Sequence, residues 1–180
     1  MTDEGRAVEM VAELMALSAR TAPKAKGMDI LLFRQVVKAE LPLLATAMRD
    51  LGTARARASF SRDAGNVERS DACFLIGMKR VPTAGLNCGA CGFSSCDEML
   101  RAELVGSSAL SGPNCAIRLV DLGIALGSAV KTASIHNLDN RIMYSVGVAA
   151  LSLGWLPDCT VALGIPLRAS GKSIYFDRQV

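Results

Sequence analysis

Apolar side chains return at helical spacing near the start of the chain. Over residues 3–20 valine, methionine and leucine side chains form a stripe with a period of three to four positions, which is the pattern of one buried helix face. Pro23 and Gly27 follow within a basic loop, and both residue types interrupt helices. The pattern therefore predicts an amphipathic helix over 3–20 that ends before this loop.

Two short apolar runs in the first half of the chain predict strands. Residues 29–37 combine a phenylalanine with β-branched side chains, which favours a strand. Residues 71–78 read DACFLIGM, and a run that is apolar on both faces is typical of a buried central strand. Between them we expect a helix over 38–51 and, over the polar segment 53–70, a loop with or without a short helix.

The composition changes sharply over residues 83–118. This segment holds four of the six cysteines and five of the sixteen glycines. We therefore expect a single domain over 1–180 into which a cofactor-binding module is inserted at 83–118. We expect two helices rich in small residues over 117–135 and 139–153.

The last third of the chain completes the mixture of helices and strands. Residues 159–164 and 172–177 read CTVALG and KSIYFD, and each predicts a short strand. Helices and strands that alternate in this way indicate an α/β or α+β class.

Composition excludes several classes of protein. Apolar residues make up 51% of the 180 positions and charged residues 21%, which argues against a disordered chain, a coiled coil and a disulfide miniprotein. A net charge of +3 with only 4% aromatic residues gives no support for nucleic-acid binding. The acidic start is unlike a signal peptide, and the most apolar stretch, 119–130, is shorter than the ~20 residues of a membrane span. We therefore expect a cytoplasmic protein without a membrane anchor.

The spacing of four cysteines, C-x2-C-x4-C-x18-C, indicates a metal centre. The cysteines are Cys88, Cys91, Cys96 and Cys115. Three ligands from one loop and a fourth from farther along the chain commonly hold an iron–sulfur cluster. Gly89 and Gly92 suit a loop whose amides face the negative cluster, and the segment after Cys96, DEMLRAELVG, predicts a helix whose positive end favours an anion.

Other interpretations of the cysteines and of the histidine stay open. A structural zinc site with four cysteine ligands is the competing interpretation, although zinc sites more often use two C-x2-C pairs. Cys73 lies in an apolar run and is expected to be a small buried hydrophobe, and Cys159 is expected at the start of a strand. His136, the single histidine, is expected at a helix end rather than in a catalytic role.

The cysteine loop resembles a known iron–sulfur module. Its sequence fits Asn-Cys-Gly-x-Cys-Gly-x3-Cys followed by a helix and a later cysteine, as in corrinoid iron–sulfur proteins and electron-transport-complex subunits. The resemblance implies a [4Fe–4S] cluster on the same four cysteines. One departure is that Ala116 stands after the last cysteine, where that module usually has proline.

The second half of the chain resembles the prokaryotic "ferredoxin domain-containing protein" family, to which no reaction is assigned. The segments that carry this resemblance are 87–93, 112–116, 121–129, 136–141 and 171–178.

A weaker resemblance links the chain to nitroreductase-like flavoproteins. The segment 19–24 is similar to an Ala-Arg-x-Ala-Pro-Ser step of that family. The segment 142–154 is similar to a helix that ends in a glycine turn, and 163–166 is similar to a Leu-Gly-Ile-Pro sequence before the last strand. This resemblance implies an α+β nitroreductase-like fold, a homodimer and FMN at the dimer interface.

The same resemblance implies residues for the flavin. Lys24 would lie near the flavin, and Lys172 and Arg178 would hold its phosphate. The Arg-Arg-Ser-x-Arg phosphate grip of that family is missing, because Arg6 is the only basic residue before Arg20. Lys24 also stands where the Ala-Arg-x-Ala-Pro-Ser step has its serine. The sequence therefore leaves open whether the protein binds FMN.

Taken together, these patterns predict an iron–sulfur redox protein. It would transfer electrons or act as a reductase through a [4Fe–4S] cluster, with or without FMN, toward a partner protein or a small-molecule acceptor. Helices 117–135 and 139–153 would form the core and a homodimer interface. The alternatives are a non-enzymatic redox or iron sensor, an electron carrier and a zinc-stabilised domain. If the protein is an enzyme, it is an oxidoreductase.

Overall fold

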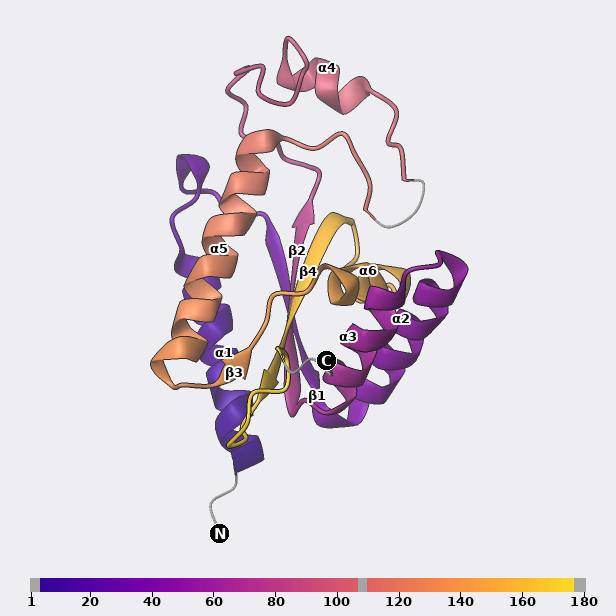
Figure 1. The fold of residues 1–180 in the computed structure, drawn as a ribbon. Helices are drawn as coiled ribbons and strands as arrows, with labels where there is room; N and C mark the ends of the chain where they lie inside the picture. Colours follow the sequence, from indigo (N-terminus) through magenta and orange to yellow (C-terminus); the bar gives the residue numbers. More distant parts are fainter. Residues whose placement is uncertain (1–3, 107–109, 177–180) are drawn as a thin grey trace.

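The structure, a computed structural model, describes residues 4–106 and 110–176 and places a sheet between two groups of helices (Figure 1). Within these residues the strands are β1 (Leu31–Val37), β2 (Ala72–Lys79), β3 (Asp139–Asn140) and β4 (Cys159–Arg168). The helices are α1 (Glu4–Thr21), α2 (Leu41–Ala54), α3 (Ala58–Glu68), α4 (Cys96–Arg101), α5 (Ala116–Ile135) and α6 (Tyr144–Ser152), and the 3-10 turns are η1 (Ala25–Gly27) and η2 (Lys38–Glu40).

Strand β2 is buried on both faces. It lies between β1 and β4 in the order β1-β2-β4-β3, and both of its pairings are antiparallel. Because side chains alternate along a strand, Phe74 and Ile76 enter one hydrophobic core while Cys73 and Leu75 enter another. The continuous apolar run of the sequence is thus a central strand, as predicted.

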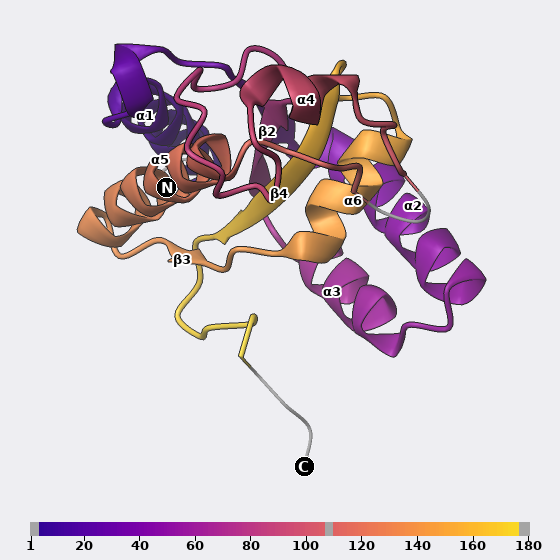
Figure 2. The same cartoon turned by 90° about the horizontal axis from the view of Figure 1, so that it is seen from above.

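The two cores correspond to two helical layers. Helices α1 and α5 cover one face of the sheet, and α2, α3 and α6 cover the other. Figure 2 shows these layers end on, with the segment that contains α4 lying across the upper end of the sheet. Within the described residues, none of the helices combines the length and the apolar character needed to cross a bilayer.

Helix α6 lies unusually close to β4. A Cβ atom added at Gly147 would overlap the backbone carbonyl of Ala162, and one added at Gly164 would overlap the side chain of Val146. The two glycines therefore let helix and strand approach nearly to backbone contact, as expected for glycines at packed positions.

The structure settles one open expectation from the sequence and contradicts another. The polar segment 53–70 contains the eleven-residue helix α3, whose buried Phe60, Ala64 and Val67 recur at helical spacing among arginines and serines. The segment 172–177 does not form a strand over its described part, 172–176. Ile174 instead donates its amide to an Asp139 carboxylate oxygen (3.1 Å), and position 177 lies outside the described residues.

Two predicted helices are shorter than expected. Helix α6 begins at Tyr144 rather than at 139, because residues 139–140 pair with β4. Helix α4 ends at Arg101 rather than near 106. Its last carbonyl groups are bound by an arginine from outside the helix, and Val105 pairs with Gly112.

The close packing of α6 on β4 leads to a prediction for Gly147→Ala. We expect the free energy of unfolding to fall by about 3 kcal/mol or more, because the added methyl group forces the helix away from the strand. Urea denaturation measures this change. Gly65→Ala is the matched control, because its Cβ would meet no atom within 4 Å in α3; it should gain about 0.5–1 kcal/mol. Equal stability of Gly147→Ala and the wild type would contradict the packing.

Candidate metal centre

The four cysteines of the sequence motif lie together at one end of the sheet. Cys88 and Cys91 lie in the loop after β2, Cys96 is the first residue of α4, and Cys115 directly precedes α5. All four line one cavity that is open to solvent, with about 270 Å³ of space when the solvent at its mouth is included. The structure therefore brings the predicted ligand residues together, although 18 residues separate the last two in the sequence.

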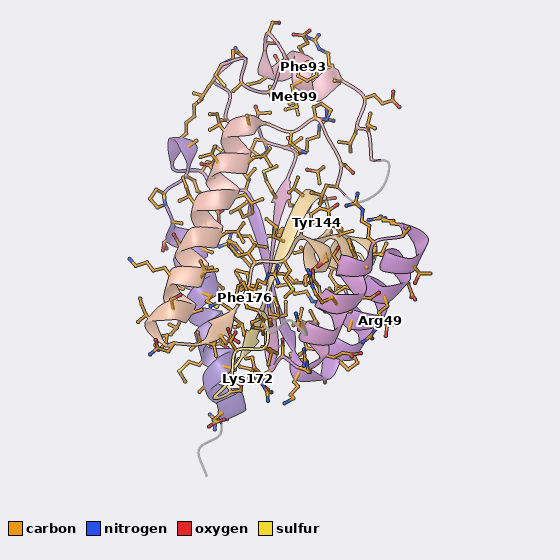
Figure 3. The ribbon with its side chains drawn as sticks, viewed as in Figure 1. Arg49, Phe93, Met99, Tyr144, Lys172 and Phe176 are labelled. Atoms are coloured by element: carbon orange, nitrogen blue, oxygen red, sulfur yellow. The ribbon has the colours of Figure 1, made fainter. Side chains whose placement is uncertain are left out.

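The cavity has a dry side and an exposed side. Cys115 is 6% exposed and packs in a small apolar cluster with Ala84 and Met99, whereas Cys88 lies at the surface. Phe93 and Met99, labelled in Figure 3, also line the cavity. A group bound here would thus be shielded from water on the α5 side and accessible from the Cys88 side.

Backbone conformations of the loop explain its glycines. Gly89 and Gly92 have φ angles of 71° and 87°, in the region where side chains other than glycine are strained. The Gly92 amide donates to the Gly89 carbonyl (2.9 Å) and closes a tight turn. This turn lets the chain between Cys88 and Cys91 curl around the cavity.

Side chains cap the start of α4. The Asn87 side-chain oxygen accepts from the Cys96 amide (2.8 Å), and the Ser95 hydroxyl accepts from the Glu98 amide (3.1 Å). The Glu98 carboxylate in turn accepts from the Ser94 amide (2.9 Å). These bonds satisfy amides that a helix start leaves free, and they hold Cys96 in place against the loop.

Hydrogen bonds favour the thiolate form of Cys96. The backbone amide of Asn87 contributes most to lowering the pKa of this thiol. The Thr83 hydroxyl and the backbone amides of Leu86 and Gly85 lower this pKa as well. Thiolate is the form that binds metal, and amide donors around a cysteine sulfur also stabilise a negative cluster. The donor arrangement therefore fits an iron–sulfur centre.

An arginine that belongs to no sequence motif joins this loop to the sheet. Arg80 follows β2 directly, and its guanidinium donates to the carbonyls of Met99 (2.8 Å), Ala102 (2.9 Å) and Pro113 (3.2 Å). It thus holds the end of α4 and the approach to Cys115 at the same time. The only signal in the sequence is a basic residue directly after a buried strand.

The four cysteines line one cavity but are not gathered as ligands of a single ion. Among the described residues, no group of three or more His, Cys, Asp or Glu side chains gathers tightly enough to hold a single metal ion. Four cysteines along one cavity, with amide donors at Cys96, suit a larger cluster with cysteine ligands.

The other cysteines and the histidine lie elsewhere. Burial raises the pKa of the Cys73 thiol, and Cys73 is fully buried in β2, which confirms its prediction as a small hydrophobe. Cys159 begins β4, and burial raises the pKa of its thiol to about 11. Neither residue lines the cavity. His136 is exposed and follows the last residue of α5, which confirms its predicted place at a helix end.

Two of the three residues expected to bind FMN, Lys24 and Lys172, lie within the described residues. The Lys24 ammonium donates to the carbonyls of Ala19, Arg20 and Ala22 at 2.7–3.0 Å, and its side chain is 2% exposed. It thus caps the end of α1. Lys172 is exposed at the opposite end of the sheet from α4 (Figure 3). Arg178 lies outside the described residues.

A second pocket opens at the start of α6. It has about 610 Å³ of space when the solvent at its mouth is included. Residues from α3 and from the segment around the start of α6 line it. Arg57, Arg141 and Tyr144 are among them. The two arginines bring positive charge to this pocket, and the Asp63 carboxylate, which accepts from the Ser145 hydroxyl (2.6 Å), lines it as well.

Comparison of sequences identifies relatives of the chain. A family model described as "Putative Fe-S cluster" matches residues 84–111, which include Cys88, Cys91 and Cys96. A second model, "Uncharacterized protein containing a ferredoxin domain", matches residues 111–178. An "Uncharacterized protein" from Archaeoglobus fulgidus is 48% identical over 171 residues, which is 95% of this chain and 91% of the relative.

Comparison of structures shows the fold. A nitroreductase with bound FMN from Desulfitobacterium hafniense matches 97% of this chain and 81% of its own, with a TM-score of 0.57 and 14% identity. A nitroreductase-like protein from Bacillus cereus matches 95% and 79%, with a TM-score of 0.59 and 11% identity. The expected α+β, nitroreductase-like fold class is thus confirmed. The sequence comparisons give the closer relationship, and the chain belongs to the family of uncharacterized proteins that contain a ferredoxin domain.

Proposed function

We propose that this chain is a redox protein that binds a [4Fe–4S] cluster through Cys88, Cys91, Cys96 and Cys115 and exchanges single electrons with a partner. The observation that carries the proposal is that all four thiols line one cavity. The match to an iron–sulfur family model over 84–111 and the nitroreductase fold support a redox role in general. The cluster type, the electron transfer and the acceptor are parts of this proposal.

The chain's own residues have distinct tasks at such a centre. A cluster would supply a reversible one-electron couple, whose potential depends on hydrogen bonds to its sulfurs and on burial. The Asn87 amide and the Thr83 hydroxyl donate to Cys96, while Met99 and Phe93 exclude water from the cavity wall. Exposed Cys88 gives a redox partner protein or a small-molecule acceptor access to the cluster edge.

The thiols also bear on where the protein works. All six cysteines are unpaired in the structure, and unpaired, metal-binding cysteines are typical of a reducing compartment. We therefore propose a cytoplasmic location, which cell fractionation can test.

Replacing one ligand tests the site directly. We expect Cys91→Ser, purified without oxygen, to lose the broad cluster absorbance and its iron and sulfide, because a weaker ligand replaces a thiolate. Its far-ultraviolet circular dichroism should stay like that of the wild type, because Cys91 lies outside the two large hydrophobic cores.

Cys159→Ser is the matched control, because Cys159 is also partly buried but does not line the cavity. It should keep the full cluster. A Cys91→Ser protein with wild-type iron and sulfide would contradict the ligand assignment. Zinc in place of iron and sulfide in the wild type would favour the zinc-stabilised domain.

A second candidate function is an FMN-dependent reductase. The observation that favours it is the pocket at the start of α6 with Arg57 and Arg141, together with the bound FMN of the Desulfitobacterium hafniense neighbour. FMN would add two-electron chemistry, and the arginines would bind its phosphate. The Cys91→Ser protein offers a clear measurement, because flavin absorbance is no longer masked by the cluster. Absence of flavin there would favour a carrier or sensor.

We also propose that the protein forms a homodimer through α5. Val120 and Ile124 are 57% and 39% exposed on this helix. Gly123 and Gly127 lie on the same exposed side, and a Cβ at either would meet no atom within 4 Å. This face is thus apolar and open to close approach by a second copy.

A charge on this face tests the dimer. We expect Val120→Glu to convert the dimer to a monomer, because the carboxylate would be buried without a partner. Light scattering after size-exclusion chromatography measures the mass. Leu43→Glu is the matched control, because Leu43 is 55% exposed on α2 in the other helical layer. A Val120→Glu protein with an unchanged dimeric mass, or a monomeric wild type, would contradict this interface.

A further inference from the structure

A buried ion pair lies near the start of α5, close in sequence to Cys115. The side chains of Arg118 and Asp121 are 1% and 4% exposed, and Arg118 Nη1 lies 2.9 Å from Asp121 Oδ2. Among the ion pairs of the described residues, no other has both side chains so fully buried.

The pair joins three segments of the chain. Arg118 Nη1 donates to the carbonyls of Ala25 (3.2 Å) and Met28 (3.0 Å), and Nη2 donates to the carbonyl of Thr83 (3.3 Å). Asp121 Oδ1 accepts from the Ala25 amide (2.8 Å). Helix α5, the turn around η1 and the segment that enters the cysteine loop are thus held together at one point.

These contacts lie near two of the four cysteines. Arg118 lies in the first turn of α5, three residues after Cys115, which directly precedes the helix. Thr83 accepts from Arg118 through its carbonyl and donates its hydroxyl to Cys96. The guanidinium therefore connects the helix that follows one ligand to the residue that supports another.

Stability of the fold does not by itself explain two buried charges at this place. Apolar side chains of similar volume are often as stabilising as a buried ion pair. Arg118 Nε is moreover buried without a hydrogen-bond partner among the described residues, and such a donor lowers stability. The charges and the forked geometry of Arg118 thus point to a role in the neighbouring site.

We propose that Arg118 and Asp121 are positioning residues for the cluster, an inference that rests on the proposed function. Arg118 holds α5 and the Thr83 segment together, so that Cys115 and Cys96 keep the separation that the cluster needs. The two charges also bias the one-electron equilibrium in opposite directions. The guanidinium favours the reduced, more negative cluster, and the carboxylate favours the oxidised cluster.

A double variant separates this role from the fold. We expect Arg118→Met combined with Asp121→Leu to keep the far-ultraviolet circular dichroism of the wild type, because neither residue belongs to the two large hydrophobic cores. After anaerobic reconstitution with ferrous iron and sulfide, it should release iron to a chelator about tenfold faster. Arg168→Met is the matched control. Arg168 pairs with Asp71, which directly precedes β2 at the end of the strand away from the cysteine loop. In this variant Asp71 retains its ion pair with Lys38 (3.0 Å). This variant should release iron at the wild-type rate.

Single variants test the electrostatic part. In a spectroelectrochemical titration, Arg118→Gln should lower the midpoint potential and Asp121→Asn should raise it. A purely structural role gives no reason for opposite shifts, because both changes break the same pair. Thr83→Val leaves the ion pair in place and removes only the hydroxyl that faces Cys96. It therefore tests the link between Thr83 and Cys96 even if the double variant fails to fold. We expect this variant also to release iron faster than the wild type.

The outcomes distinguish this inference from the proposed function. A wild type that takes up no iron and sulfide would contradict the proposed function, and this inference with it. The positioning role alone would be overturned by a different result. In that case the wild type binds a cluster, the double variant and Thr83→Val release iron at the wild-type rate, and the midpoint potentials of the single variants are unchanged. Faster iron release together with opposite potential shifts would support it.

Discussion

Burial of β2 on both faces is the constraint on which the rest of the structure depends. Its residues from Ala72 to Met78 are almost fully inaccessible to solvent, and their alternation divides the interior into two hydrophobic cores. One core needs α1 and α5, and the other needs α2, α3 and α6. The end of this strand leads directly into the cysteine loop, so the most buried element of the fold positions the candidate site.

The cysteine module has little core of its own. Three buried residues, Ala84, Met99 and Cys115, form its hydrophobic cluster, and α4 has six residues, too few to be stable as an isolated helix. Polar contacts supplement this small core, because the Arg80 guanidinium binds the backbone carbonyls of Met99, Ala102 and Pro113. Binding of a cluster would therefore contribute directly to the stability of this module.

Local patterns predicted the elements that a single stretch of sequence determines. The apolar run at 71–78 indicated a strand covered on both sides, and the cysteine spacing indicated which residues would share a site. Contacts between distant residues could not be predicted in this way. The run of arginines and serines at 53–70 left open whether a helix forms there, because the apolar face of α3 is complete only against α2 and α6. Likewise, Lys24 was assigned to a flavin from its neighbours in sequence, and its bonds to the end of α1 depend on how the chain folds back.

Quantification of iron and acid-labile sulfide, with Mössbauer and EPR spectra of the same anaerobically purified sample, tests the central claim most directly. We expect about four iron atoms and four sulfides per chain, and an EPR signal that appears on one-electron reduction. Stoichiometric zinc without sulfide, or a protein that binds neither metal after reconstitution, would contradict the assignment of the four cysteines to an iron–sulfur cluster.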